Sequence, residues 1–464
     1  MIRARIGILG AGNRGATAYG RYMLRRPDLA EVVALADTRP DRLEAVGDEH
    51  GVPPEHRHAD WKDLLRRERD LDAVIIALPD RLHYPAAMAA MRRVPAILLE
   101  KPMCSSPTEL RALRAAARRC GTDITVAHVL RYTPFFLRIR QLLERGAIGT
   151  LQTVRHTEQV GYWHFAHSYV RGNWRREDES SPMILSKASH DFDILRWLVG
   201  ARCTHVESVG RLGHFTRANA PEGSTDRCDQ GCAVERSCPY SALHIYLDRL
   251  PPQNAWPHDV VSLDTSPAGI ATALHTGPYG RCVYRCDNDV MDHQSVTLGF
   301  ANGVTATMNV SAFTRDNTRT LHLMGSLGEI IGDFTAGTIS VIDFRTDEVR
   351  TSTMAMAADV THGGGDDQLM ADFLGRTLER KRRGVSPDAL TSLEQSLESH
   401  DMAFAAERSR IAGARVALAR RRAEVKPDAS AVPPPQLEPP HLAESTPLAV
   451  SDAVEPPATE RAAE

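Results

Sequence analysis

The feature that most constrains the fold is a glycine-rich turn placed directly after the first apolar segment. The run Arg5–Leu9 predicts a buried strand, and Gly-Ala-Gly-Asn-Arg-Gly follows it and opens a helical pattern. The first glycine permits a tight turn, the second lets the backbone approach a pyrophosphate, and the third lets the helix pack closely. The residues expected to hold a dinucleotide in this turn are Gly10, Gly12, Asn13, Arg14 and Gly15.

An acidic residue follows the second predicted strand at the distance that a dinucleotide-binding unit requires. Asp37 lies 22 residues after Gly15, at the end of the apolar run Val32–Ala36. A carboxylate at this position accepts hydrogen bonds from ribose hydroxyls and repels a 2′-phosphate. The sequence therefore favours NAD, while the nearby Arg39 leaves room for NADP.

Short apolar runs alternate with helical patterns over residues 1–125, which predicts a parallel sheet covered by helices, a Rossmann domain. The other strands expected there are Glu31–Ala36, Ala73–Ala77, Ala96–Leu99 and Ile124–Ala127. A helix is bracketed by Ser106-Pro107 as its start and Gly121 as its stop.

Longer alternating segments replace this pattern over residues 126–424. Gln294–Phe300 and Val304–Ala312 flank an Asn-Gly turn and predict a hairpin, so we expect an α+β domain with a large, mostly antiparallel open sheet. An open sheet of this kind favours a homo-oligomer, and a helix is expected after residue 388. Residues 425–464 are rich in Pro, Ala and Glu and predict a disordered tail.

Composition excludes several classes of function. The net charge is −3, so no basic field favours nucleic acid. No uninterrupted apolar run approaches the roughly 18 residues that span a bilayer. The first residues run directly into a strand pattern and leave no room for a signal peptide, so we expect a cytoplasmic protein that acts on a small molecule.

Several polar residues follow the predicted parallel strands, where ligands bind in open α/β sheets. The third strand is followed by a Leu-Pro segment that ends in a histidine, the fourth by Glu-Lys-Pro, and the fifth by a His-x-x-Arg-Tyr-x-Pro segment. From these segments we expect cofactor contacts by Pro79, His83, Glu100 and Lys101 and substrate contacts by Arg131 and Tyr132.

With these motifs the sequence resembles the glucose–fructose oxidoreductase / inositol dehydrogenase / rhizopine-catabolism family (Gfo/Idh/MocA). The resemblance covers about residues 1–415 and extends through His190-Asp191-Phe192-Asp193 and the late His362-Gly363-Gly364-Gly365-Asp366. It implies a Rossmann domain, an α+β domain whose sheet mediates oligomerisation, and redox chemistry at a hydroxyl-bearing carbon of a sugar or cyclitol. It also implies that Lys101 and His190 carry catalysis.

The chemistry of these two residues suits alcohol oxidation. A histidine such as His190 is the natural general base near neutral pH, and a lysine such as Lys101 stabilises a developing alkoxide. Asp193 lies three positions after His190 and is expected on the same helix face, where it would orient the imidazole or the substrate.

One position departs from the family pattern. Many members carry an aspartate four residues before the catalytic histidine, where this chain has Ser186, and Lys187 follows it. Lys187 is one of only five lysines among 56 Lys and Arg residues. We expect it either to lower the pKa of His190 by like-charge repulsion or to bind an anionic group of the substrate.

An aromatic, histidine-rich stretch runs from Gly161 to Tyr169. Sugars stack their apolar faces on aromatic rings, so Trp163 is a candidate wall of the substrate site, beside His190. A packed loop explains the same residues equally well.

The cysteines allow three interpretations. Cys228, Cys232 and Cys238 lie in a polar insertion, and Cys282 and Cys286 follow. A structural metal, free thiols and disulfides all remain open, with zinc or an iron–sulfur cluster as the metals that thiolates favour. Cys104, Cys120 and Cys203 are expected to be small buried residues.

Together these observations predict an NAD-dependent oxidoreductase for a sugar, sugar acid or cyclitol. One alternative is an NAD-dependent glycosidase that oxidises a hydroxyl transiently, eliminates the aglycone and returns the hydride. A further alternative is a dinucleotide-binding sensor without catalysis, which would need neither Lys101 nor His190.

Overall fold

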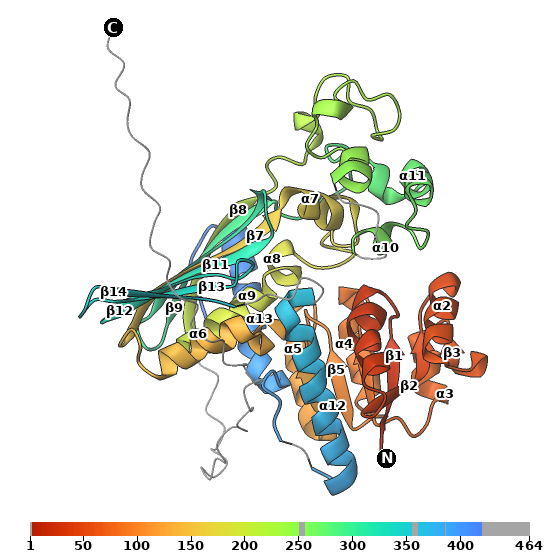
Figure 1. Cartoon of the computed structure of the whole chain (residues 1–464), viewed down its shortest axis with the longest axis horizontal. Coiled ribbons are helices and arrows are strands. Elements are labelled where there is room, and N and C mark those ends of the chain that lie inside the picture. The colour runs from red at the N-terminus through yellow and green to blue at the C-terminus, as the bar shows by residue number, and fades with distance from the viewer. Residues whose placement is uncertain (1, 250–255, 355–360, 386, 420–464) are drawn as a thin grey trace, which may run out of the picture. The chain divides into compact units, whose positions relative to one another are not determined.

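The computed structural model describes residues 2–249, 256–354, 361–385 and 387–419. These residues contain a parallel sheet followed by a larger mixed sheet (Figure 1). The predicted disordered tail, 425–464, lies outside the described residues.

The first sheet has six parallel strands in the order β3-β2-β1-β4-β5-β6. They are β1 (Ala4–Leu9), β2 (Ala30–Ala36), β3 (Arg57–His58), β4 (Ala73–Ile76), β5 (Ala96–Leu99) and β6 (Asp123–Val126). The strands β2 and β3 are added on one side of β1, and the strands β4, β5 and β6 are added on its other side. The carboxyl ends of β1 and β4 therefore border the crevice where such sheets bind ligands.

Helices cover both faces of this sheet, because alternate strand residues point to opposite sides. In β4, Ile75 belongs to one buried core and Ile76 to the other. The first core is completed by η1 (Asn13–Gly20), α1 (Arg21–Arg25), α2 (Pro40–His50) and α12 (Gly365–Arg383). The second is completed by α3 (Trp61–Arg67), α4 (Asp80–Ala90) and α5 (Pro107–Cys120).

Helix α5 has the predicted ends. The Ser106 side chain accepts a hydrogen bond from the Glu109 amide at 3.2 Å, and Gly121 ends the helix with a φ of +64°. Helix α12 comes from far along the chain, yet its Leu369 and Phe373 pack with Tyr19 in the first core. The amino-terminal sheet is thus completed by a helix more than 200 residues later in the sequence.

The second sheet has nine strands in the order β14-β13-β12-β11-β7-β10-β9-β8-β15. They are β7 (Leu151–Gly161), β8 (Cys203–Arg211), β9 (His293–Phe300), β10 (Thr305–Thr314), β11 (Thr318–Gly325), β12 (Gly328–Asp333), β13 (Thr338–Asp343), β14 (Glu348–Thr353) and β15 (Val416–Ala417). Only β7 and β10 pair in parallel among the described strands of this sheet, so the prediction of a mostly antiparallel sheet is confirmed. The predicted hairpin is β9–β10, and its Gly303 has a φ of +89°.

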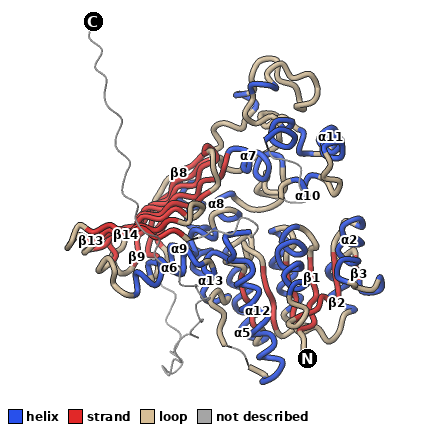
Figure 2. Tube along the Cα trace, viewed as in Figure 1, coloured by secondary structure: helices blue, strands red, loops and turns tan. Residues whose placement is uncertain are grey.

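One face of the nine-stranded sheet carries α6 (Pro134–Glu144), α9 (Ser189–Val199) and α13 (Leu393–Ala412) (Figure 2). Alternate strand residues remain exposed, including Val209, Phe313 and Ile331. The sheet therefore keeps an open face, as the sequence pattern predicts.

A long segment between β8 and β9, drawn in green in Figure 1, holds α10 (His258–Val261) and α11 (Pro267–Thr276). It packs against α7 (Tyr162–Phe165) and η4 (Ala166–Arg171), which follow β7. Within the described ranges, no helix is long and apolar enough to cross a membrane.

Candidate active site

The glycine-rich turn is built as its sequence predicts. Gly10 has a φ of +92°, and a Cβ there would lie 2.4 Å from the Ala77 carbonyl oxygen. A Cβ on Gly15 would lie 1.9 Å from the Gly10 oxygen. A Cβ on Gly12 would approach only the Arg42 guanidinium, at 3.5 Å. The first and third glycines thus allow tight packing, whereas the second leaves backbone open to a ligand.

Asp37 lies against this turn at the end of β2. Its carboxylate accepts hydrogen bonds from the backbone amides of Ala11 and Arg39, both at 2.9 Å. Arg42 lies 3.7 Å away, while the Arg39 side chain pairs with Asp41. These bonds hold the carboxylate at the mouth of the turn, the place where a ribose hydroxyl would meet it.

Arg14 and Glu100 belong to an ion network at the glycine-rich turn. Arg14 lies 2.6 Å from Glu100 and 2.5 Å from Asp366, and the Tyr19 hydroxyl donates to Glu100 at 2.5 Å. Burial alone would raise the pKa of Glu100, but Arg14 and Lys101 hold it below its ordinary value. The network ties the glycine-rich helix to β5 and α12 and orients the backbone that leads to Lys101.

Pro79 and His83 follow the carboxyl end of β4. Pro79 precedes the first turn of α4. The two ring nitrogens of His83 lie 2.6 Å from the Leu78 carbonyl and 2.7 Å from the Pro102 carbonyl. His83 therefore fastens the loop after β4 to the loop after β5, beside Lys101.

Lys101 belongs to the first domain and contacts the second domain close to His190. The Lys101 ammonium donates to the Ser186 carbonyl at 2.8 Å, and Ser186 ends α8 (Met183–Ser186), four residues before His190. Burial lowers the pKa of Lys101. Burial also lowers the pKa of His190 well below 6.5, and Lys101 is the charge that contributes most to that shift. Both groups are thus desolvated, and the carboxylates of Glu100 and Asp80 partly offset the effect of burial on Lys101.

Further histidines lie near His190, beyond those expected in the site from the sequence. The His128 ring lies 5.6 Å from the His190 ring and 5.7 Å from the His400 ring, and His362 lies 6.1 Å from His190. Burial lowers the pKa of His128 well below its ordinary value. His128 directly follows the fifth predicted strand, so the sequence could have indicated it as a site residue. His400 lies in the late helix α13, and no local sequence pattern marks it as part of the site.

Asp193 shares helix α9 with His190, but its carboxylate points elsewhere. It forms two hydrogen bonds with the Arg131 guanidinium, both at 2.6 Å, and both side chains are almost fully buried. Burial raises the pKa of Asp193, and Arg131 lowers it in part. Tyr132 donates to Asp372 of α12 at 2.9 Å. Arg131 and Asp193 therefore join the segment after β6 to α9, and Tyr132 joins the same segment to α12.

Lys187 is engaged by an acidic partner. Its ammonium lies 3.1 Å from Glu158 on β7, and the same carboxylate group lies 2.7 Å from Arg319 on β11. Arg319 also pairs with Asp191 at 2.9 Å. Lys187 thus stands near the site, with its charge balanced inside a buried network.

The aromatic stretch gathers at the edge of the inserted segment. The ring of Trp163 lies 5.4 Å from Trp256 and 5.8 Å from His164. Nearby, the Asn13 side chain of the glycine-rich turn donates to Asp259 at 3.3 Å. The insertion therefore reaches the cofactor turn, a contact that no sequence signal had indicated.

None of the eight cysteines forms a disulfide bond. Cys228, Cys232 and Cys238 line one pocket together with Cys282, although no three His, Cys, Asp or Glu side chains of the described chain stand close enough to chelate a metal as placed. Cys104 and Cys203 are buried as expected. The expectation for Cys120 is wrong, because it is exposed in the last turn of α5.

Two family models match the chain. Residues 4–128 match the oxidoreductase family with an NAD-binding Rossmann fold, and residues 140–418 match the C-terminal alpha/beta domain of that family, Gfo/Idh/MocA. The chain belongs to this family. The resemblance stated from the motifs is thereby confirmed, as is the predicted fold.

Individual relatives are more distant. The chain is 30% identical to inositol 2-dehydrogenase 4 of Saccharopolyspora erythraea, over 48% of this chain and 61% of the relative. It is 29% identical to the uncharacterized oxidoreductase YrbE of Bacillus subtilis strain 168, over 44% of this chain and 56% of the relative. The matches thus span less than two thirds of either relative.

Solved structures show the same fold. Levoglucosan dehydrogenase, in complex with NADH and levoglucosan, superposes with a TM-score of 0.65 at 18% identity, over 90% of this chain and 99% of that one. An oxidoreductase from Agrobacterium radiobacter, in complex with NAD+, L-tartaric acid and magnesium, gives a TM-score of 0.62 at 18% identity, over 89% and 98%. The open backbone at Gly12 and the fixed carboxylate of Asp37 fit the NAD-binding domain that the family model describes.

Proposed function

We propose that this protein is an oxidoreductase that transfers a hydride between NAD and a hydroxyl-bearing carbon of a sugar, sugar acid or cyclitol. The observation that carries the proposal is the hydrogen bond from the Lys101 ammonium, at the carboxyl edge of the first sheet, to the Ser186 carbonyl, four residues before His190. The ligands named with its structural relatives, levoglucosan and L-tartaric acid, belong to the same chemical class.

When bound, NAD supplies the hydride acceptor. His190 takes the proton from the substrate hydroxyl, and its lowered pKa keeps the imidazole neutral and able to accept it at pH 7. Lys101 stabilises the alkoxide charge that develops on the same oxygen. The Ser186 carbonyl positions the Lys101 ammonium, so the main chain holds this group where many relatives carry an aspartate.

We further propose that NAD is preferred over NADP. Asp37 would accept hydrogen bonds from the adenosine ribose and repel a phosphate at that position. Arg42, 3.7 Å from Asp37, offsets part of that repulsion, so residual use of NADP is expected.

A turnover screen of sugars, sugar acids, inositols and aryl glycosides with NAD and NADP tests the proposal. Lys101→Met should lower kcat by about 10²–10³-fold, the usual cost of losing one transition-state donor, and leave NAD affinity within a few-fold. Lys62→Met, at an exposed lysine outside the site, is the matched control and should retain full activity. A fully active Lys101→Met enzyme would remove Lys101 from the mechanism.

The screen also separates the alternatives. Cleavage of aryl glycosides with tightly bound NAD and no accumulation of NADH would indicate the glycosidase. Tight NAD binding without turnover of any substrate would indicate the sensor. Both outcomes contradict the proposed net oxidation.

We also propose that the open face of the nine-stranded sheet joins copies of the chain in a homo-oligomer. Val209, Phe313 and Ile331 expose apolar surface on alternate strand positions. Mass measurement in solution tests this, and a monomer at micromolar concentration would contradict it.

A further inference from the structure

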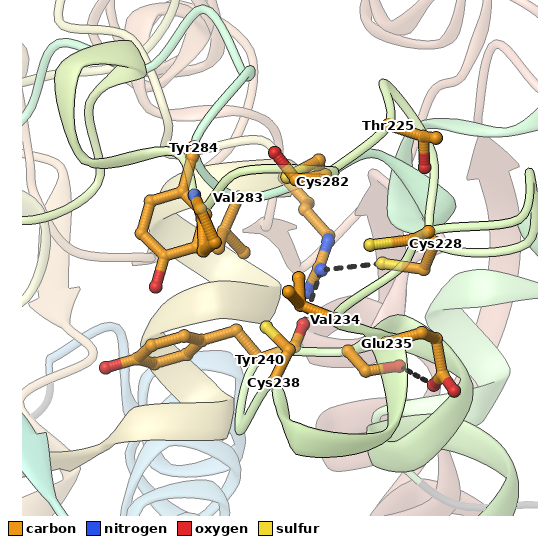
Figure 3. A pocket seen from close by; sticks show the side chains of 14 residues that line it. Thr225, Cys228, Val234, Glu235, Cys238, Tyr240, Cys282, Val283 and Tyr284 are labelled. Atoms are coloured by element: carbon orange, nitrogen blue, oxygen red, sulfur yellow. Dashed lines mark hydrogen bonds between the residues drawn. The ribbon is translucent and has the colours of Figure 1, made fainter.

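Four of the eight cysteines line one pocket in the segment between β8 and β9 (Figure 3). They are Cys228, Cys232, Cys238 and Cys282. The space among the lining residues that admits the centre of a water-sized sphere is about 10 Å³. That is close to what one water molecule or one metal ion occupies, and well below the size of an iron–sulfur cluster.

The backbone brings these cysteines together from two stretches of chain. The Cys228 amide donates to the Gly280 carbonyl at 3.0 Å, and the Cys282 amide donates to the Asp226 carbonyl at 2.9 Å. These two bonds clamp Cys228 beside Cys282. Cys238 closes the pocket directly after the short helix η6 (Glu235–Ser237), with its amide bonded to the Val234 carbonyl at 2.9 Å.

A buried guanidinium points into the pocket without an acidic partner. Arg171 is 1% exposed, and its Nε and Nη2 donate to the carbonyls of Arg281 and Tyr240, both at 2.7 Å. Its Nη1 is buried and has no hydrogen-bond partner among the described residues. Burying a charge is costly unless an opposite charge balances it. The pocket therefore lacks the negative charge that Arg171 requires.

The sulfur of Cys228 faces two nitrogen donors. It accepts the Ala242 amide at 3.3 Å and lies 3.8 Å from Nη2 of Arg171. Two N–H groups therefore face this one sulfur, on the side of the pocket that Arg171 lines.

The segment around the cysteines has little else to order it. From Thr216 to Pro239 no residue is fully buried, and the regular structure there consists of η5 (Arg217–Asn219) and η6. A segment that buries so little apolar surface gains little stability from packing. Small units of this kind are commonly held by a structural metal.

We propose that Cys228, Cys232, Cys238 and Cys282 bind one structural zinc ion, with Arg171 balancing the charge of the site. Four thiols each release a proton and form four Zn–S bonds, which gives a complex of charge −2 that Arg171 offsets in part. The side chains must turn inward to do so, since as placed no three of them chelate a metal. Tetrahedral zinc has no need of a fifth ligand, and Cys286 is left out because its thiol donates to the Cys282 carbonyl.

Metal analysis of the full chain, purified in the presence of a reductant, tests the proposal. We expect one zinc per chain, with little iron and no acid-labile sulfide. Cobalt substituted for zinc should give an intense sulfur-to-cobalt charge-transfer band and the visible absorption of a tetrahedral site. This measurement uses the unaltered protein, so it does not depend on whether a variant folds.

Cysteine variants identify the ligands. Cys232→Ser should lower zinc content several-fold after dialysis against a chelator. Cys286→Ser, on the same stretch as Cys282 but outside the set, and Cys120→Ser, at the exposed end of α5, should both retain one zinc.

Three results would overturn the assignment. They are the absence of bound zinc after reconstitution of the reduced wild-type chain, stoichiometric iron with sulfide, and zinc retained fully by Cys232→Ser. Loss of zinc without any effect on the activity of the enzyme would leave the assignment intact, because the proposal concerns structure and does not rest on the proposed function.

Discussion

His400 gives the sharpest test of the buried histidine cluster, through the dependence of stability on pH. Its Nδ1 lies 3.2 Å from the Ser396 carbonyl and therefore carries the hydrogen. Its Nε2 accepts the Met103 amide at 2.9 Å, so a second proton there would face another N–H group. Burial lowers the pKa of His400 from 6.5 to about 3.

The sign and size of the effect follow from this shift. The unfolded chain binds a proton near pH 6.5, whereas the folded protein binds it only near pH 3, so stability falls as the pH falls below 6.5. Each pH unit in this window costs about 1.4 kcal/mol, which gives about 2 kcal/mol between pH 6.5 and 5. The pKa of buried His167 is also lowered to about 3 and adds a similar loss.

The substitution His400→Gln removes the titrating group and keeps an oxygen that can accept the Met103 amide. We expect the difference in unfolding free energy between pH 7 and pH 5 to shrink by about 2 kcal/mol, measured from urea unfolding at each pH. His244→Gln, at a half-exposed histidine, should leave this difference as in the wild type. If His400→Gln keeps the wild-type pH dependence, the reasoning about His400 is wrong.

Two further predictions concern the residues around the site. Asp193→Asn should destabilise the fold by about 3–5 kcal/mol, because it leaves the buried Arg131 guanidinium without its carboxylate partner. The double variant Arg131→Met with Asp193→Leu should recover most of this loss, measured by urea unfolding. A loss of under about 1 kcal/mol in Asp193→Asn would refute the importance of this ion pair. Asp37→Asn should raise the ratio of kcat/KM for NADP over NAD by about 10-fold or more, since it removes the repulsion of a 2′-phosphate, and an unchanged ratio would show that Asp37 does not select the cofactor.

Local sequence predicted the first domain well because each of its signals is local. The strand after residue 4, the glycine at residue 10 and the capped helix from Pro107 depend on neighbours in the chain. Strand β3 is only two residues long, which is too short to show the alternating pattern by which a strand is predicted. The packing of α12 on this domain depends on contacts across more than 200 residues, which no local pattern encodes.

The candidate site was predicted less completely, because it is assembled by contacts between distant parts of the chain. The resemblance to the family pointed to Lys101 and His190, which the structure places after β5 and in the first turn of α9. Sequence could place Asp193 on the His190 helix, but not turn its carboxylate toward Arg131. The direction of a side chain is set by packing, so the proposed roles of Asp193, Arg131 and Tyr132 in chemistry remain predictions.

The return of α12 to the first domain has a consequence for biosynthesis. When residues 1–128 have left the ribosome, one apolar face of their sheet still awaits Leu369 and Phe373. At about 5–20 residues per second, translation needs roughly 10–50 s more to reach the end of α12. During that interval the nascent chain exposes an apolar surface, which favours aggregation until the late helix covers it.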